Sequence, residues 1–306
     1  MSRRQSVSFL IKRFKEVGLR PDTRHGQNFL VDLNLVELLA DTARIERQDV
    51  VLEVGTGTGS LTALLARRAG AVVTIELSAA LQQLASEELE EFDNIIMLQQ
   101  DALKNKNRLN PQLVEAVVSQ LAAAPGRRAK LVANLPYNIA TPVISNLLAT
   151  EFLPVSMTVT IQKELADRIA ARPGTKDYSG LSIWVQSQCD VQVVRVLPPT
   201  VFWPRPKVHS AIIQITVRPE KRASIPDLPF FHQCVRSLFI HRRKFLRSGI
   251  LGAFKQQLDK PAVDHIMSAL NLGPTTRAEQ LDVDEIRVLC EAIRRTVATA
   301  NDPETD

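Results

Sequence analysis

The residue types at the ends of two predicted strands suit the binding of a nucleoside. A β-branched run ends in Glu53-Val-Gly55-Thr-Gly57-Thr-Gly59, and glycines at a strand-to-helix turn let a ligand approach the backbone closely. Glu76 ends the next run and can accept hydrogen bonds from both hydroxyls of a ribose, as acids do in NAD sites and in S-adenosylmethionine sites. A G-x-G-x-x-G dinucleotide fingerprint is the alternative, but the third glycine comes one residue early for it.

Two more predicted strands end in polar residues of matching chemistry. Asp101 follows one run and can accept from the N–H donors of an adenine amine, and Asn134 ends the run KLVAN. Ligands of open parallel sheets bind beyond the carboxyl ends of the strands. We therefore expect Gly55, Glu76, Asp101 and Asn134 to line one crevice. Glu76 taken alone could also be a solvated acid at a strand end, and the coincidence of four positions favours the nucleoside site.

The stretch Asn134-Leu135-Pro136-Tyr137 resembles the [Asn/Asp/Ser]-Pro-Pro-Tyr motif of methyltransferases that act on amino groups. An adenine exocyclic amine is a poor nucleophile because its lone pair is delocalised into the ring. The Asn134 side-chain oxygen and the Leu135 carbonyl can each accept one of its N–H bonds, which pyramidalises the nitrogen. Pro136 shapes the loop, and Tyr137 offers a face for a flipped-out base. The rate of methyl transfer would come from the positioning of the amine and from electrostatic stabilisation. The alternative is an N-cap asparagine beside a core tyrosine.

Alternating strands and helices must position these residues. Strands at 49–55, 71–77, 94–101, 130–134 and 156–162, separated by helices, predict a parallel sheet covered on both faces. Strands at 191–199 and 209–217 lack an intervening helix and are expected to pair antiparallel at the sheet edge. From Pro219 the pattern becomes helical, at 229–257, 261–271 and 282–298. We expect a basic arm (1–24), a sheet domain (25–218), a helical domain (219–300) and a disordered tail (301–306).

Composition limits the remaining possibilities. The 306 residues carry a net charge of +5, which fits a nucleic-acid partner but is not specific to one. Three cysteines and five histidines lack metal-ligand spacing, so we expect no metal. No apolar run approaches the roughly 20 residues of a membrane span. The basic N-terminus lacks a secretory apolar stretch; it is either a transit peptide or, as we expect, an arm on a cytoplasmic protein.

The densest positive charge lies in residues 230–250, which we expect to form one helix. At 100° per residue, Arg236, Arg243 and Arg247 share one face, and Phe231, Val235, Leu238, Phe239, Phe245 and Leu246 share the other. With Arg242 and Lys244, the three arginines are the predicted RNA contacts. A plain solvated face is the alternative. Arg242 falls on the apolar side, so either the helix bends there or Arg242 reaches into a crevice between the two expected domains.

The sequence resembles the ribosomal RNA small-subunit adenine dimethyltransferase family (KsgA-type). The resemblance covers roughly residues 25–285. Its matching segments are HGQNFLVD (25–32), EVGTGTGSLT (53–62), IEL (75–77), QQDAL (99–103), NLPYNIATP (134–142), QKELADRI (162–169), PGTKDYSGLS (173–182), VFWPRPKVHSA (201–211), HRRKFLRS (241–248) and GPTTRAEQL (273–281). It implies a seven-stranded Rossmann-like S-adenosylmethionine-dependent methyltransferase sheet with a small helical domain. It also implies dimethylation of two adjacent adenines in the 3′-terminal hairpin of small-subunit rRNA, by a monomer acting on immature small subunits.

Residue roles carry over with this resemblance. Asn28 and Leu30 would cover the cofactor, Gly55 with Gly57 would contact its methionine part, Glu76 the ribose, Asp101 the adenine, and Asn134 both the cofactor and the target amine. Phe202 would be a second stacking face, or else a core aromatic. The sequence departs from the family at Thr56, usually proline, and at His209, usually aspartate. Thr-Arg-His before GQNFL and the segment 241–245 also differ, which affects expected RNA contacts more than the cofactor site.

Three alternatives remain open. A macrolide-resistance type enzyme would methylate a large-subunit adenine; GPTTRAEQL and the helical domain match the small-subunit type better. A ribosome-assembly factor could bind RNA without turnover, which the intact residues 134–137 argue against. A dinucleotide-dependent oxidoreductase is disfavoured by the early third glycine.

Overall fold

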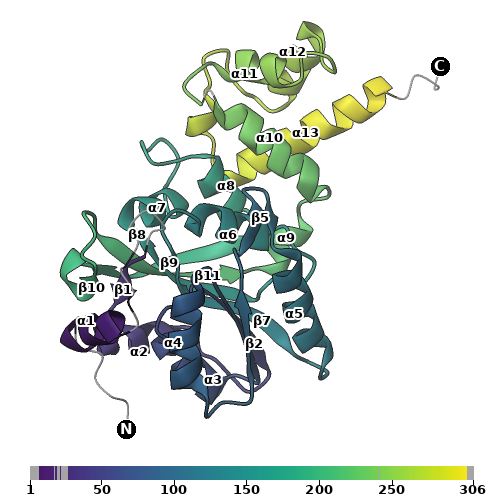
Figure 1. Cartoon of the computed structure of the whole chain (residues 1–306). Helices are drawn as coiled ribbons and strands as arrows, with labels where there is room; N and C mark the ends of the chain where they lie inside the picture. The colour runs from purple at the N-terminus through teal and green to yellow at the C-terminus, as the bar shows by residue number, and fades with distance from the viewer. Residues whose placement is uncertain (1–6, 17, 19–20, 22–26, 241, 302–306) are drawn as a thin grey trace. The chain divides into compact units, whose positions relative to one another are not determined.

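The computed structural model describes residues 7–16, 18, 21, 27–240 and 242–301. The chain divides into two compact units, which are treated separately here (Figure 1). The first contains the residues up to 166 together with 191–217, and the second contains 167–190 and the chain from 218 onward. Most of the expected arm at 1–24 and nearly all of the expected tail at 301–306 lie outside the described residues, so those expectations stay predictions.

The first unit is built on a seven-stranded sheet of order β4-β3-β2-β7-β8-β11-β9. The strands are β2 (Asp49–Val54), β3 (Ala71–Glu76), β4 (Ile95–Gln99), β7 (Arg128–Asn134), β8 (Ser156–Gln162), β9 (Cys189–Leu197) and β11 (Ser210–Val217). The first five in this order pair in parallel, and β11 pairs antiparallel with β8. The five predicted parallel strands are confirmed, as is an antiparallel strand toward one edge.

The strand order reverses at β2, which lies between β3 and β7. Chain crossovers leave the sheet in opposite directions on the two sides of such a point, so the loops after β2 and β7 diverge. A crevice at the carboxyl ends of the strands results. Gly55, Glu76, Asp101 and Asn134 lie at, or just after, the carboxyl ends of β2, β3, β4 and β7.

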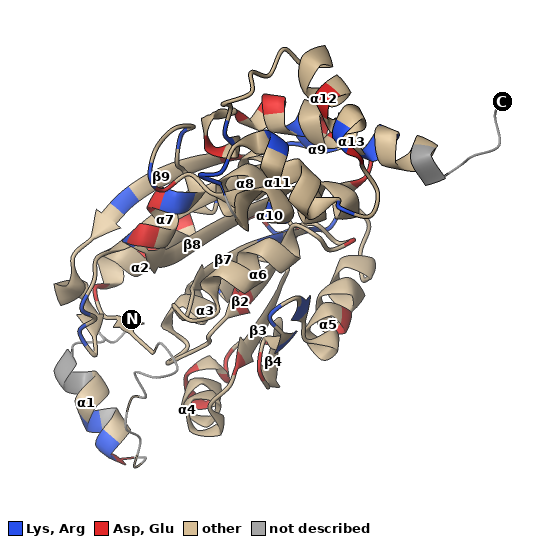
Figure 2. Ribbon diagram, turned by 90° about the horizontal axis from the view of Figure 1, so that it is seen from above, with Lys and Arg blue, Asp and Glu red and all other residues tan. Residues whose placement is uncertain are grey.

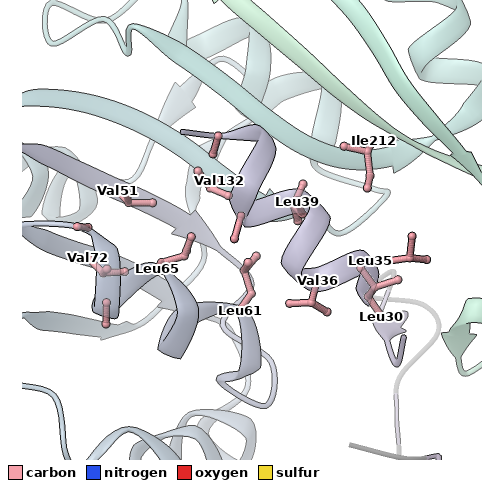
Figure 3. Packing of buried hydrophobic residues seen from close by; sticks show 14 of the residues in the cluster. Leu30, Leu35, Val36, Leu39, Val51, Leu61, Leu65, Val72, Val132 and Ile212 are labelled. Carbon is pink, nitrogen blue, oxygen red and sulfur yellow. The ribbon is translucent and has the colours of Figure 1, made fainter. Parts of the chain in front are cut away.

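Helices cover the sheet: α2 (Leu33–Thr42), α3 (Ser60–Arg68), α4 (Ala79–Leu89), α5 (Pro111–Ala122), α6 (Ala140–Leu147) and α7 (Lys163–Ile169). Side-chain caps start several of them: Asp32 accepts from the Asn34 amide, Ser78 from that of Leu81, and Asn110 from that of Gln112. One core cluster joins α2 and α3 to the sheet, with Leu39 and Leu65 against Val51, Val132 and Ile212 (Figure 3).

Several elements of the first unit were not expected. They are α1 (Val7–Glu16), α2, the short pair β1 (Phe29–Leu30) and β10 (Phe202–Trp203), and the hairpin β5 (Leu103–Asn105) with β6 (Arg108–Leu109). Strands β1 and β10 pair antiparallel although they lie far apart in the sequence. A two-residue strand has too little periodicity to predict, and only its partner makes it a strand.

The second unit contains α8 (Gly180–Gln186), α9 (Pro219–Ala223), α10 (Leu228–Ile240), α11 (Leu246–Ala253), α12 (Lys260–Ala269) and α13 (Val283–Asn301). Segment 167–190 belongs here by its contacts, unlike the expected division at 218. The Tyr178 hydroxyl donates to the Leu281 carbonyl at 3.0 Å, and the Trp184 ring stacks on His232 with centroids 4.1 Å apart. These two buried aromatic residues bind the segment to the helices.

The single helix expected at 229–257 is wrong, because α10 ends at Ile240 and α11 begins at Leu246. Phe245 has extended backbone and pairs with Arg277 in an isolated bridge, and the Leu246 amide donates to the Thr276 carbonyl at 2.7 Å. These long-range bonds take the backbone out of the helical pattern. The bend at Arg242 is therefore the correct one of the two alternatives.

The described part of the chain has neither a membrane-spanning helix nor a cluster of metal-binding side chains. None of its helices is both long enough and apolar enough to span a membrane. None of its His, Cys, Asp and Glu side chains gather in threes or more as a metal would require. Cys189, Cys234 and Cys290 are buried free thiols.

Candidate active site

A cavity of about 200 Å³ lies at the carboxyl ends of β2, β3, β4 and β7. It is lined by Gln27, Asn28, Phe29, Val54, Gly55, Gly57, Glu76, Leu77, Leu81, Gln100, Asp101, Ala102, Asn134, Pro136, Asn138 and Ile139. The crevice expected from Gly55, Glu76, Asp101 and Asn134 is thus present, and Asn28 and Gly57, expected from the resemblance, also line it. Each of the four strands contributes one of these polar or glycine positions because parallel strands end at the same edge.

The glycine loop forms one wall and requires glycine at specific places. Gly55 and Gly57 have positive φ, +88° and +58°, which side chains rarely adopt. A Cβ atom on Gly57 would lie 3.3 Å from the Phe29 ring, and one on Gly55 would lie 3.4 Å from the Pro136 ring. The loop is therefore enclosed by Phe29 on one side and by the loop after β7 on the other.

Glu76 is held by the backbone around it. Its Oε2 accepts from the Gly57 amide and its Oε1 from the Ser78 amide, each at 3.0 Å. Burial raises the pKa of Glu76, and the amides of Ser78, Gly57 and Leu77 counteract that rise. Each carboxylate oxygen keeps a second lone pair. Two fixed acceptors are what the two hydroxyls of a ribose require.

A buried network of hydroxyl groups connects Thr56 of the glycine loop to Glu53. Glu53 is 1% exposed, and its Oε2 accepts from the Thr62 hydroxyl at 2.6 Å and the Thr74 hydroxyl at 2.7 Å. Thr74 is also 2.6 Å from the hydroxyl of Thr56. Burial, with the charge of Glu76, raises the pKa of Glu53 to about 8. Sequence reasoning missed this network, although a threonine within the apolar run AVVTIEL was a usable signal.

Asn134 presents an acceptor that lacks a partner. Its Nδ2 donates to the Asn28 carbonyl at 2.8 Å, which fixes the amide plane. Its Oδ1 is buried and has no hydrogen-bond partner among the residues that the structure describes. A buried unpaired acceptor costs about 1–3 kcal/mol, so such an atom calls for a ligand or functional explanation. A donor such as an amine N–H would satisfy it.

The rest of the Asn-Leu-Pro-Tyr stretch is anchored around this amide. The Leu135 amide donates to the Thr160 carbonyl at 3.1 Å, while its side chain is buried. Pro136 lines the cavity. The Tyr137 hydroxyl lies 2.6 Å from that of Ser210, and burial raises the pKa of Tyr137. Tyr137 is half-buried, so part of its ring surface stays accessible.

Two predicted site residues lie in the core instead of at the cavity. Leu30 and Phe202 face each other across β1 and β10, and both belong to the main hydrophobic cluster. Phe202 is only 3% exposed. The core aromatic, the second expectation for Phe202, is the one that the structure displays.

The predicted RNA contacts separate into two groups. Arg242 donates to the carbonyls of Tyr178 and Lys176 and lies 3.5 Å from Glu279, and Arg247 donates to both Asp264 oxygens at 2.5 and 2.7 Å. The guanidinium groups of both arginines are thus bonded to residues of the second unit. By contrast, Arg236, Arg243 and Lys244 are exposed. The expected stripe of Arg236, Arg243 and Arg247 on one helix does not exist, because the three lie on α10, in the turn, and on α11.

A basic groove nevertheless lies beside this turn. Its volume is about 770 Å³, and its lining residues are Gly174, Thr175, Lys176, Phe239, Ile240, Arg242, Arg243, Lys244 and Glu279. Ile240 is 72% exposed. The groove combines exposed positive charge with apolar surface, as nucleic-acid sites often do.

The mostly parallel seven-stranded sheet, with a glycine-walled cavity at its carboxyl edge, defines a Rossmann-like methyltransferase fold. Two solved structures share it: a dimethyladenosine transferase from Plasmodium falciparum (TM-score 0.71, 86% of this chain and 96% of that one) and the 23S rRNA methyltransferase ErmE (0.61, 87% and 99%). Each is 23% identical in sequence, so the likeness is one of fold.

The family follows from the sequence comparisons. Residues 19–287 match the model of the ribosomal RNA adenine dimethylase family, and the chain belongs to that family. The ribosomal RNA small subunit methyltransferase A of Geobacillus thermodenitrificans is 39% identical over 270 residues, 88% of this chain and 89% of that protein. The protein of the same name from Clostridium acetobutylicum is 36% identical over 281 residues, 92% and 96%. The family and its fold imply the use of S-adenosylmethionine.

Proposed function

We propose that the protein transfers methyl groups from S-adenosylmethionine to the exocyclic amines of two adjacent adenines in the 3′-terminal hairpin of small-subunit (16S) rRNA. It would thereby give dimethyladenosines during biogenesis of the small ribosomal subunit in the cytoplasm, acting as a monomer. The proposal rests on Asn134, which lines the cavity at the carboxyl ends of the strands. Its side-chain oxygen has no hydrogen-bond partner among the described residues. The family and the relatives at 36–39% identity support the choice of substrate.

The residues around the cavity fit S-adenosylmethionine. Glu76 offers two fixed acceptors for the ribose hydroxyls, and Asp101 an acceptor for the adenine amine. Gly55 and Gly57 leave the backbone open to the methionine part, and Asn28 lines the cavity beside them. When bound, this cofactor supplies an electrophilic methyl group.

The chain's own part in the reaction is to orient the amine. Asn134 Oδ1 and the Leu135 carbonyl would accept its two N–H bonds, so the nitrogen would become pyramidal and its lone pair would be less delocalised into the ring. The bond from Asn134 Nδ2 to the Asn28 carbonyl holds the acceptor in place before the substrate arrives. The hydrogen bond of Tyr137 to Ser210 holds the ring on which the base would stack. Such preorganised acceptors stabilise the developing charge without further rearrangement.

The proposed RNA surface is the groove next to the turn between α10 and α11. Arg243 and Lys244 are exposed there, and Lys176 lines the same groove. Basic side chains also lie along α1 (Figure 2), where Lys12 and Lys15 are exposed. Exposed cations of this kind bind phosphates and release counterions. Arg242 and Arg247 would instead shape the surface through their internal partners.

Methyl transfer to ribosomal subunits tests the proposal. Small and large subunits from cells lacking both modifications would be incubated with labelled cofactor, and the modified base would be mapped. We expect label on two adjacent adenines near the 3′ end of small-subunit rRNA. Label in the large subunit would favour the macrolide-resistance type. Subunit binding without transfer would favour an assembly factor, and binding of NAD in place of S-adenosylmethionine would favour an oxidoreductase.

A further inference from the structure

Helix α1 packs onto an aromatic cluster through Phe14 and also buries Leu10. Leu10 and Phe14 are 1% and 2% exposed, whereas Lys12 and Lys15 on the same helix are exposed. The Phe14 ring meets the Phe29 ring edge-on, with centroids 5.3 Å apart, and its centroid is 5.2 Å from that of Trp203. A helix this short is marginal by itself in water. Its position therefore depends on these tertiary contacts.

The cluster under α1 is also a wall of the cofactor cavity. It contains Phe14, Leu81 and Leu84, with Phe29 and Trp203 packed against them. Phe29 and Leu81 line the cavity itself. The Phe29 ring also lies close to Gly57, where an added Cβ would meet it at 3.3 Å. Phe29 thus contacts both Phe14 of α1 and the glycine loop.

We propose that α1 is part of the cofactor site and that Phe14 is a positioning residue, which keeps Phe29 against the glycine loop and Leu81 against the cavity. This inference rests on the proposed function, because it assumes that the cavity takes S-adenosylmethionine. Without Phe14, the Phe29 and Leu81 side chains lose a packing partner and gain alternative rotamers. Binding of the cofactor would then have to restore their order, at a cost in affinity.

Thermodynamic linkage makes the effect reciprocal. If docking of α1 strengthens cofactor binding by some factor, bound cofactor must strengthen the docking of α1 by the same factor. A helix that served only to cover apolar surface would add to global stability and show no such coupling. This difference separates a positioning role from a merely structural one.

The first measurement is cofactor affinity of the full-length chain by calorimetry. We expect Phe14→Ala to raise the dissociation constant of S-adenosylmethionine about tenfold, within the range of measured couplings. Phe14→Leu, which keeps an apolar side chain of similar reach, should restore most of the affinity. Two control variants should bind as the parent does. Glu16→Gln removes an exposed charge from the same helix, and Phe254→Ala truncates a buried ring that stacks on Phe230 in the second unit.

The second measurement is hydrogen exchange of the α1 amides. Saturating cofactor should slow exchange in residues 10–16 of the parent by about the same factor of ten, and should have less effect in Phe14→Ala. If Phe14→Ala binds the cofactor with parental affinity while losing as much thermal stability as Phe254→Ala, the inference is overturned and α1 is only structural. A parent chain that fails to bind S-adenosylmethionine would instead overturn the proposed function, and this inference with it.

Discussion

We expect neighbouring basic residues to contribute unequally to RNA binding, because some are exposed and others form ion pairs within the second unit. Arg243 and Lys244 are exposed in the basic groove, whereas the Arg247 guanidinium donates to both oxygens of Asp264 at 2.5 and 2.7 Å. Each phosphate that a cation neutralises contributes about 0.7–0.9 to the slope of log affinity against log salt. The double variant Arg243→Gln, Lys244→Gln should therefore lower the slope by about 1.4–1.8. Arg247→Gln should change it by much less than one phosphate contact.

The assay is filter binding of undermethylated small subunits between about 50 and 200 mM salt, where such slopes are usually measured. The double variant should bind more weakly at low salt and approach the parent as the salt concentration rises. Its affinity for S-adenosylmethionine should stay parental, because no residue of the groove lines the cofactor cavity. A parental slope in the double variant would refute the assignment of the groove and direct attention to Lys12 and Lys15. A large loss in Arg247→Gln would show that its ion pair opens on RNA.

Three further predictions concern the cofactor cavity. Glu76→Ala should weaken S-adenosylmethionine binding at least about tenfold by calorimetry, since hydrogen bonds to a charged group contribute about 1.5–3 kcal/mol; parental affinity would remove Glu76 from the site. Asn134→Ala should abolish most single-turnover methyl transfer while RNA binding survives, and a rate within a few-fold of the parent would contradict the amine mechanism. Glu53 has a pKa of about 8 in the folded state, against an ordinary value of 4.5. Between these two pH values the folded state keeps a proton that the unfolded state loses. The free energy of unfolding must therefore fall as the pH rises from 4.5 to about 8. Glu53→Gln should flatten that fall, by up to about 1.4 kcal/mol per pH unit in chemical denaturation, and an unchanged pH profile would show that Glu53 is ionised in the fold.

Much of the cofactor site was predictable because it depends on a rule of topology. Parallel strands joined by helices end at one edge, so residues that close successive strands must come together there. Glu76, Asp101 and Asn134 could be placed beside the glycine loop for this reason, without knowledge of any side-chain packing. The family resemblance added the roles together with Asn28 and Gly57, and both of these residues line the cavity.

What the sequence could not provide depends on contacts between distant segments. Periodicity at 230–250 is helical throughout, yet the backbone bonds of residues 245 and 246 to 276 and 277 break the helix and disperse the arginine stripe. Phe202 is a core residue because β10 pairs with β1, and Phe14 reaches the cavity wall because α1 docks there. Local sequence determined which residue types close each strand. Tertiary packing alone decided which cations remain free and which aromatic rings surround the cofactor cavity, because each of those outcomes requires a partner from elsewhere in the chain.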